Sequence, residues 1–301
     1  MNTLTLLVGL PASGKSTYAR ENLANQNTII LSSDELRKEL LGDENCQDNN
    51  DLVFKTLYKR AKEHLQNGKN VVIDATNINL KARRTALSHF EKMPIRREAI
   101  VFATPFEVCI ERDKERSRTV GEAVIKKFLY RFEIPMKYEG FDIIRFVKSN
   151  LVYYYDILCS QMVEYDQKNP HHLYNLIEHC ELCESLVREK AKIEWEKDSL
   201  LLSAKVHDIG KPYTQTIDEN GIAHYYSHHN VGAYVLMCSE KPKDIEMLFY
   251  VNFHMQPFFW KEKKTYDKYR KLFGERLYNN LMILHECDKI ASGTKENCEN
   301  E

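Results

Sequence analysis

The sequence predicts an α/β domain with a parallel sheet, followed by an all-helical domain. Short apolar runs alternate with helix-like stretches up to about residue 150. After Val147 the alternation stops, and the remaining chain is helix-like. Histidine content changes at the same place, because nine of the eleven histidines fall between His171 and His285. Two modules with different chemistry explain these three observations.

Five short apolar runs in the first half are expected to be buried strands. They are Thr3–Val8, Thr28–Leu31, Val71–Asp74, Ala99–Ala103 and Asp142–Val147. Helical stretches lie between them, for example Asp51–Leu65, where apolar residues recur at helical spacing. Strands separated by crossover helices predict a mainly parallel sheet covered on both faces.

Proline steps divide the helix-like second half. They are Asn169-Pro170, Lys211-Pro212, Lys241-Pro242 and Gln256-Pro257. We expect one domain over residues 1–150, a linker over 151–168 and an all-α domain over 169–301.

Composition indicates a soluble globular protein, with 43% hydrophobic and 29% charged residues among 301. The net charge of -1 gives no global basic field, although a local groove can be basic on a neutral protein. No apolar run approaches the roughly 18 residues that span a bilayer. Eight scattered cysteines fit reduced thiols in a cytoplasmic protein. The close pair Cys180 and Cys183 is expected on a helix face.

The segment Gly9–Ser16 fits the P-loop pattern G-x-x-x-x-G-K-[ST] at every fixed position. It follows an apolar strand and opens a helix, which is the context that a phosphate cradle requires. Lys15 is expected to reach the β- and γ-phosphates of ATP, and the Ser16 hydroxyl to ligate Mg²⁺. The expected cofactor-binding residues are Gly9, Ser13, Gly14, Lys15, Ser16, Thr17 and Asp74.

The segment Ser32–Arg37 follows the second expected strand. A serine N-cap places Asp34 and Arg37 on one face of the first helical turn. There the Asp34 carboxylate can take the proton of an attacking hydroxyl, and Arg37 can hold a phosphate of the acceptor. The alternative is a capped surface helix with an i,i+3 ion pair.

Two further segments carry charges that phosphoryl transfer uses. Asp74 ends the third expected strand, where it is either a ligand of Mg²⁺-bound water or an ordinary strand-end turn residue. Arg112, Arg116 and Arg118 precede Gly121 and a helix beginning near Glu122. Such a run fits a mobile lid that presents arginines to the transferring phosphate, or else a solvated helix face.

Together these motifs resemble the polynucleotide 5′-kinases of phage and bacterial RNA end-healing systems. The resemblance covers roughly the first 150 residues. It implies that Asp34 activates the 5′-hydroxyl, that Arg37 contacts the acceptor strand's phosphate, and that Lys15 acts on the phosphates of ATP. It also implies that Arg112 and Arg116 are the paired lid arginines, by their four-residue spacing, and it leaves Arg118 unassigned.

The step His207-Asp208 closes the apolar helical run Leu200–Val206. Further metal ligands at suitable intervals are His179, His228, His254 and Asp288. A nitrogen and oxygen set without thiolate suits Mn²⁺, Fe, Co²⁺, Ni²⁺ or Mg²⁺ better than structural Zn²⁺. Two such metals would generate a hydroxide nucleophile and clamp a phosphate. Taken singly, each histidine is more often a core or surface residue, but a buried Asp208 needs a partner.

This second half resembles the HD superfamily of metal-dependent phosphohydrolases, over roughly His171–Asp288. The resemblance implies that the ordered H…HD…H…H…D set falls on His179, His207, Asp208, His228, His254 and Asp288. His229 is an alternative to His228, and Lys211 would contact phosphate.

A kinase joined to a phosphohydrolase is understandable if the two halves act on different ends of a broken strand. The prediction is therefore an end-healing enzyme that phosphorylates 5′-hydroxyl ends and removes 2′,3′-cyclic or 3′/2′ terminal phosphates. Its expected partners are nucleic-acid ends, with RNA favoured over DNA, and an RNA ligase. One alternative is a small-molecule or nucleoside kinase fused to an HD nucleotidase. Another is a non-catalytic nucleotide-sensing module.

Overall fold

The computed structural model describes residues 1–44, 46, 48–170, 172–195, 198–241 and 244–293. Their contacts divide the chain into two compact units. The first comprises Met1–Phe128 and Pro135–Leu151, and the second comprises Leu129–Ile134 and the chain from Val152 onward. A short stretch within the first expected domain thus packs with the second half of the chain. The expected boundaries at 150 and 168 stay a prediction.

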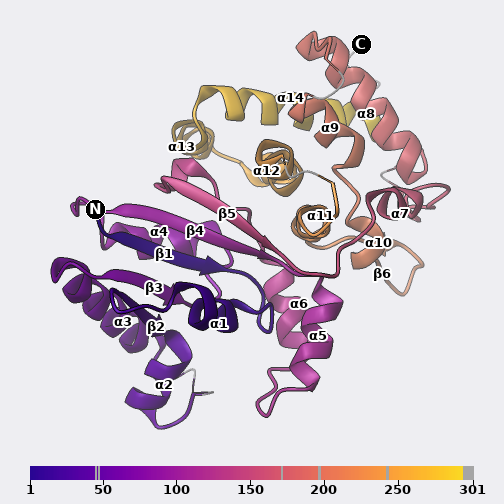
Figure 1. Cartoon of the computed structure of the whole chain (residues 1–301). Coiled ribbons are helices and arrows are strands. Elements are labelled where there is room, and N and C mark those ends of the chain that lie inside the picture. Colours follow the sequence, from indigo (N-terminus) through magenta and orange to yellow (C-terminus); the bar gives the residue numbers. More distant parts are fainter. Residues whose placement is uncertain (45, 47, 171, 196–197, 242–243, 294–301) are drawn as a thin grey trace. The chain divides into compact units, whose positions relative to one another are not determined.

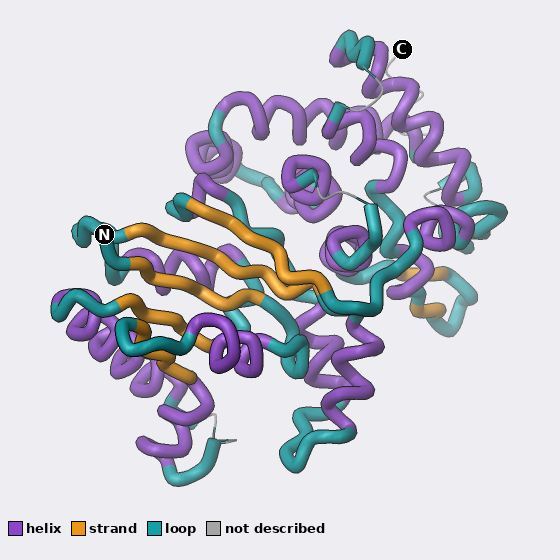
Figure 2. Tube along the Cα trace, in the orientation of Figure 1, coloured by secondary structure: helices purple, strands orange, loops and turns teal. Residues whose placement is uncertain are grey.

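The first unit contains a five-stranded sheet in the order β2-β3-β1-β4-β5. Every neighbouring pair is parallel, and Figure 2 shows the strands side by side. The predicted fold class of this half is therefore confirmed. The strands are β1 (Thr3–Val8), β2 (Thr28–Ser32), β3 (Asn70–Asp74), β4 (Arg96–Ala103) and β5 (Ile143–Lys148).

The central strand β1 is buried on both faces, because Leu4, Leu6, Leu7 and Val8 are all excluded from solvent. This burial is expected for a parallel sheet, because each helix that connects two parallel strands crosses one face of the sheet and covers it. Among them, α3 packs against β2 and β3. The helical segments are α1 (Lys15–Tyr18), η1 (Ala19–Leu23), α2 (Ser33–Leu41), α3 (Asn50–Gln66), α4 (Leu80–Ser88), α5 (Phe106–Lys114), α6 (Glu122–Leu129) and η2 (Lys137–Glu139).

A buried ion pair fixes the loop that follows β3. Arg83 of α4 and Glu139 of η2 are both fully buried and form two parallel bonds of 2.7 and 2.8 Å. Arg83 also donates to the carbonyl of Asn77 at 3.1 Å. Because bidentate pairs fix orientation, this contact holds the carboxyl end of β3 in place.

The second unit is helical, as predicted, except for a two-stranded antiparallel hairpin that the sequence did not suggest. Within it α8 packs against α9 and α14, and α12 packs against α9 and α11 (Figure 1). Its elements are α7 (Tyr155–Ser160), α8 (Leu176–Ala191), α9 (Ser199–Val206), α10 (Lys211–Thr214), β6 (Thr216–Ile217), β7 (Ala223–His224), α11 (His228–Met237), α12 (Ile245–Phe253), η3 (Gln256–Phe259), α13 (Lys263–Phe273) and α14 (Glu275–Ala291). Cys180 and Cys183 are buried on α8, and each is a free thiol.

Two asparagines attach the stretch 129–134 to the helices of the second unit. Asn252 accepts from the Ile134 N–H at 2.7 Å and donates to the Phe132 carbonyl at 3.1 Å. Asn230 donates to the Tyr130 carbonyl at 3.0 Å. Side chains thus satisfy backbone groups that have no strand partner in this stretch.

Among the described residues, no helix combines the length and the apolar character needed to cross a membrane.

Candidate functional site

The P-loop connects β1 to α1 and depends on backbone conformations that favour glycine. Gly14 has φ of 95°, in the left-handed region. A Cβ at Gly9 would lie 2.8 Å from Ser13 Oγ, a distance that real Cβ atoms essentially never show, and 3.0 Å from Phe102 Cβ. Both positions therefore favour glycine, as in a phosphate-binding loop.

Lys15 is buried in this loop. Its Nζ donates to the carbonyls of Gly9 at 3.0 Å and Leu10 at 2.6 Å. Burial lowers the pKa of Lys15, while the nearby Asp74 carboxylate raises it. The ammonium is thus held at the base of the loop, where phosphate oxygens are expected.

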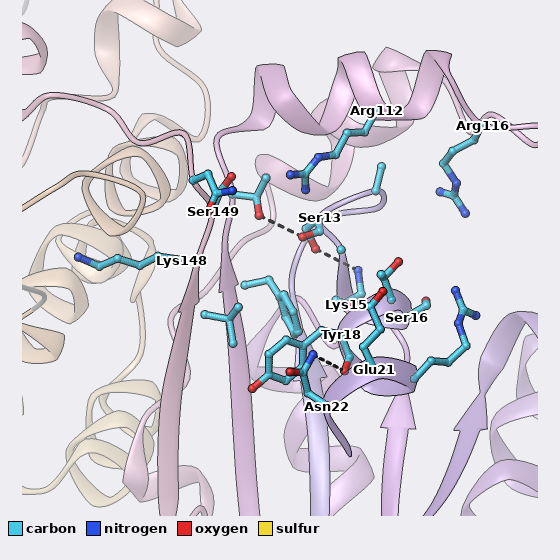
Figure 3. A pocket seen from close by; sticks show the side chains of 18 residues that line it. Ser13, Lys15, Ser16, Tyr18, Glu21, Asn22, Arg112, Arg116, Lys148 and Ser149 are labelled. Atoms are coloured by element: carbon cyan, nitrogen blue, oxygen red, sulfur yellow. Dashed lines mark hydrogen bonds between the residues drawn. The ribbon is translucent and has the colours of Figure 1, made fainter. Parts of the chain in front are cut away.

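A cavity of about 530 Å³ opens above the P-loop (Figure 3). Arg112 and Arg116 line it, and Figure 3 shows both side chains directed toward the loop. Arg112 Nη1 lies 3.7 Å from the position a Cβ would take on Gly14. The cavity therefore places the two arginines assigned by the resemblance beside the phosphate loop. Lys148 and Ser149, from the end of β5, also line it and were not singled out from the sequence.

A second cavity, of about 450 Å³, lies at the carboxyl ends of β2 and β3. Its lining brings together the P-loop, the expected acceptor residues and the lid. The charged and hydroxyl side chains in it are Lys15, Ser16, Ser32, Ser33, Asp34, Arg37, Asp74, Thr76, Arg116 and Arg118. Ligands bind at the carboxyl ends of strands in open α/β sheets, and this arrangement follows that rule.

Asp34 lies between two arginines in this second cavity. Its Oδ1 is 2.7 Å from Arg37 Nη1, and its Oδ2 is 3.2 Å from Arg118 Nη1. The Ser32 side chain accepts from the Glu35 N–H, which confirms the predicted N-cap. Arg37 is buried and also donates to Asn50 Oδ1 at 3.0 Å. The carboxylate itself is half-exposed and faces the cavity that an acceptor would enter.

Arg118 is the residue that sequence reasoning left unassigned. Its guanidinium joins Asp34 to Glu44, whose Oε1 is 3.2 Å from Arg118 Nε. The sequence did show Arg118 as the third arginine of the lid run. The four-residue spacing that paired Arg112 with Arg116 did not extend to it, so no role was predicted.

The base of the lid segment is fixed by Asp113, a buried carboxylate on α5. Asp113 accepts from the Val120 N–H at 3.0 Å and from the Gly121 N–H at 2.8 Å. Asp113 lies where the loop carrying Arg116 and Arg118 begins, and its carboxylate binds the backbone where this loop ends.

The second unit contains a buried cluster of histidines and carboxylates. His179, His207 and Asp208 each offer one ligand atom to a common position. The Nε2 atoms of His179 and His207 are 3.1 Å apart, and each lies 3.5 Å from Asp208 Oδ2. Asp288 Oδ1 lies 3.1 Å from the His179 ring, so all four side chains converge.

A second group uses the other oxygen of the same aspartate. Asp208, His228 and His254 again offer one ligand atom each to a common position. Asp208 Oδ1 is 3.0 Å from His228 Nε2 and 3.5 Å from His254 Nε2. The structure thus brings together all six residues expected as ligands, with Asp208 shared by two adjacent groups.

The hydrogen bonds of these rings fit a cation at the cluster. Three of the histidines, His207, His228 and His254, place Nδ1 within 2.8 Å of a backbone carbonyl. A carbonyl only accepts, so Nδ1 of each ring carries a proton, and Nε2 is the nitrogen that faces the cluster and can bind a metal. The Nε2 atoms of His228 and His254 face each other at 3.1 Å. A metal ion bound by both Nε2 atoms would account for this close approach.

The expected phosphate contact, Lys211, adjoins the same cluster. Its Nζ lies 2.7 Å from Asp208 Oδ2 and 2.6 Å from Gln167 Oε1. Burial by itself would raise the pKa of Asp208, but Lys211 and the neighbouring histidines hold that pKa well below its usual value. Gln167, which the sequence did not identify, therefore helps to hold the lysine beside the ligands.

His229 lies beside the cluster, but neither ligand group among the described residues includes it. Burial and the neighbouring histidines lower the pKa of His229 to about 2. The geometry therefore favours His228 over His229 as the ligand.

The sequence also matches two known protein families. Residues 4–135 match the family described as AAA domain, and residues 176–293 match the family described as HD domain. The chain carries a P-loop kinase domain followed by an HD domain. The kinase domain contains the P-loop and the lid, and the HD domain contains the buried cluster.

The chain is also similar to a curated protein. This relative is the L-seryl-tRNA(Sec) kinase of Methanococcus maripaludis, 28% identical over 142 residues, which cover 44% of this chain and 53% of the relative. The chain thus spans about half the length of this curated relative.

Solved structures similar to the chain include a chain of the Pnkp1/Rnl/Hen1 RNA repair complex. It is 25% identical, with a TM-score of 0.40, covering 56% of this chain and 54% of that chain. A gluconokinase from Sinorhizobium meliloti 1021 is 16% identical with a TM-score of 0.35, covering 50% of this chain and 83% of that chain.

Proposed function

We propose that this protein heals broken RNA ends. Its kinase domain phosphorylates 5′-hydroxyl ends with ATP, and its HD domain removes 2′,3′-cyclic or 3′/2′ terminal phosphates. The observation that carries the proposal is the acceptor cavity, in which Asp34 lies between Arg37 and Arg118 beside the P-loop residues Lys15 and Ser16.

In the kinase reaction the half-exposed Asp34 carboxylate accepts the proton of the attacking 5′-hydroxyl. The hydroxyl oxygen then bonds to the γ-phosphorus as the bond to ADP breaks. Arg37 contacts a phosphate of the acceptor strand, and Arg112 and Arg116 stabilise charge on the transferring group. Ser16 and Asp74 would hold Mg²⁺, which neutralises phosphate charge when bound.

Two features support a polynucleotide acceptor over a free nucleoside. Two guanidinium groups, those of Arg37 and Arg118, line the acceptor cavity in addition to Arg116, which acts on the transferring group. Phosphodiesters of a strand would pair with such guanidinium groups. The curated relative, by its name, also acts on a group carried by an RNA.

In the HD domain, His179, His207, Asp208 and Asp288 would hold one divalent ion, while Asp208, His228 and His254 would hold another. Such ions supply positive charge that polarises a phosphate and activates water. Mn²⁺, Fe, Co²⁺, Ni²⁺ and Mg²⁺ fit this nitrogen and oxygen set. Lys211 pairs with a phosphate oxygen and orients the terminal group toward the cluster.

An RNA break has two chemically different ends, and two catalytic domains on one chain could each act on one of them. Cleavage often leaves a 5′-hydroxyl on one side and a cyclic or terminal phosphate on the other. Neither end is suitable for direct joining, and each needs one of the two chemistries. The healed ends would then pass to an RNA ligase.

The test of the kinase half uses γ-labelled ATP, Mg²⁺ and a 5′-hydroxyl oligoribonucleotide. We expect label on the 5′ end with the wild type and a loss of roughly 10²–10⁴-fold with Asp34→Ala, the range of general-base assistance. Asp156→Ala, a change at an aspartate that is 88% exposed, serves as the control. Label on free nucleosides but not on oligonucleotides would contradict the proposal and favour a nucleoside kinase.

A further inference from the structure

A cavity adjoins the buried histidine and carboxylate cluster, which we call the metal cluster. Part of its lining has no role in the proposed hydrolysis. The cavity has a volume of about 850 Å³, within the range of small-molecule sites. Asp208, His228 and Asp288 open into it on one side. Exposed aromatic side chains line another part of it.

The first aromatic element is the segment before α11. Tyr226 is 70% exposed, and its ring stacks on that of His224 with centroids 5.7 Å apart and planes 6° apart. Ser227 follows with φ of 62°, a left-handed conformation that is strained for a side-chain-bearing residue. This turn lets Tyr226 be exposed while His228, two residues later, is buried in the cluster. The strained residue Ser227 thus connects the expected metal ligand His228 directly to the exposed ring of Tyr226.

The second aromatic element is η3, which follows His254. Phe258 packs edge-on against the ring of His285 with centroids 4.3 Å apart. Phe259 is 65% exposed and lines the same cavity. Pro257 is buried and fixes the backbone of this turn. The ring of Phe259 is therefore displayed to solvent from a constrained segment.

We propose that Tyr226 and Phe259 form a stacking platform for the terminal nucleobase of the strand whose phosphate reaches the metal cluster. This inference rests on the proposed hydrolase function and names the group recognised beside the phosphate. Exposed aromatic faces bind nucleobases by stacking, which every base permits because each has a π-face. Lys211 and Lys289 line the same cavity and supply cations for the phosphate. The site would thus bind a nucleotide end without selecting its base.

The test compares two 5′-blocked oligoribonucleotides that both end in a 3′-phosphate. One has an ordinary last nucleotide, and the other has an abasic last residue. Hydrolysis is measured with Mn²⁺, and binding by fluorescence anisotropy of a label at the blocked 5′ end. The variants are Tyr226→Ala and Phe259→Ala. Trp195→Ala, which removes an aromatic ring that is 66% exposed and does not line the cavity, is the matched control.

For the ordinary end we expect each platform variant to raise KM and Kd about tenfold, which lies within the measured range for loss of one base–aromatic stack. The kcat for the ordinary end, and all constants for the abasic end, should match the wild type. Equal Kd values for the ordinary and abasic ends of the wild type would overturn the platform. A wild type that hydrolyses neither end would instead contradict the hydrolase function, and the Kd comparison would still decide the platform.

Discussion

Asp34 depends on its neighbours, because a carboxylate between two guanidinium groups is oriented by both of them. Arg37 belongs to the same helix, so sequence spacing was enough to place it on the same face as Asp34, where the two form an ion pair of 2.7 Å. Arg118 reaches Asp34 from a segment 84 residues away. No local pattern encodes that approach, which explains why its role was missed.

We predict that Arg118→Ala lowers kcat/KM for a 5′-hydroxyl oligonucleotide about tenfold, consistent with the loss of a hydrogen bond to a charged group. The reason is that Asp34 loses one of its two orienting partners and the acceptor loses a cation. Initial rates over a range of oligonucleotide concentrations measure the change. Arg118→Lys should recover part of the loss, because it keeps the charge but not the fork.

Arg96→Ala is the matched control, because Arg96 is exposed at the start of β4, at the opposite end of that strand from the site. An Arg118→Ala enzyme with wild-type constants would show that Arg118 only bridges surface carboxylates.

The sharing of Asp208 predicts the metal content of single variants. Wild type should bind about two divalent ions, because Asp208 gives one oxygen to each ligand group. His179→Ala and His254→Ala should each bind about one, and Asp208→Ala almost none. Mass spectrometry of metal in protein equilibrated with Mn²⁺ measures these contents.

His64→Ala is the control, since His64 lies on α3 in the first unit. A wild type that binds one ion, lost in both His179→Ala and His254→Ala, would indicate a single, jointly held metal.

At the scale of elements, burial decided what was predictable. Strands such as β1 and β3 were predicted because a buried strand of a parallel sheet is mainly apolar. Helices such as α3 were predicted because their buried residues recur at helical spacing. The hairpin β6–β7 was missed because each strand has two residues, too few for any alternation to show.

The contacts of the stretch 129–134 could not be predicted from the sequence for a related reason. Its partners are the side chains of Asn230 and Asn252, which lie about 100 residues further along the chain. A polar side chain on a buried helix needs a hydrogen-bond partner, but the sequence does not show which backbone groups will be that partner.

We predict that Asn252→Leu lowers the free energy of unfolding of the second unit by about 1–3 kcal/mol, the cost of leaving buried polar groups unsatisfied. The change removes the partners of the Ile134 N–H and the Phe132 carbonyl. Urea unfolding followed by tryptophan fluorescence measures it, because both tryptophans, Trp195 and Trp260, belong to the second unit.

Asn280→Ala provides the comparison, because Asn280 is partly exposed and its amide donates to the Tyr250 hydroxyl. Equal unfolding midpoints for Asn252→Leu and wild type would show that the bonds to 129–134 contribute no stability.

For the whole molecule, the candidate sites were more predictable from sequence than the contacts around them. The P-loop and the HD step are local patterns, so their chemistry could be inferred directly from the residues. Grouping the six ligands required the resemblance, and the structure then placed five of them in two metal-binding groups, with Asp288 beside His179. Lys148, Gln167 and the aromatic wall of the HD cavity come from scattered segments and needed the fold.

The central claim is that one chain prepares both ends of an RNA break. The direct measurement gives the protein ATP, Mg²⁺ and Mn²⁺ with an RNA that has a 5′-hydroxyl and a 2′,3′-cyclic phosphate, and analyses both ends. We expect the wild type to convert both, Asp34→Ala to convert only the 3′ end, and His207→Ala only the 5′ end. If either variant lost both conversions, or if the wild type left one end unchanged, the two-ended account would be contradicted.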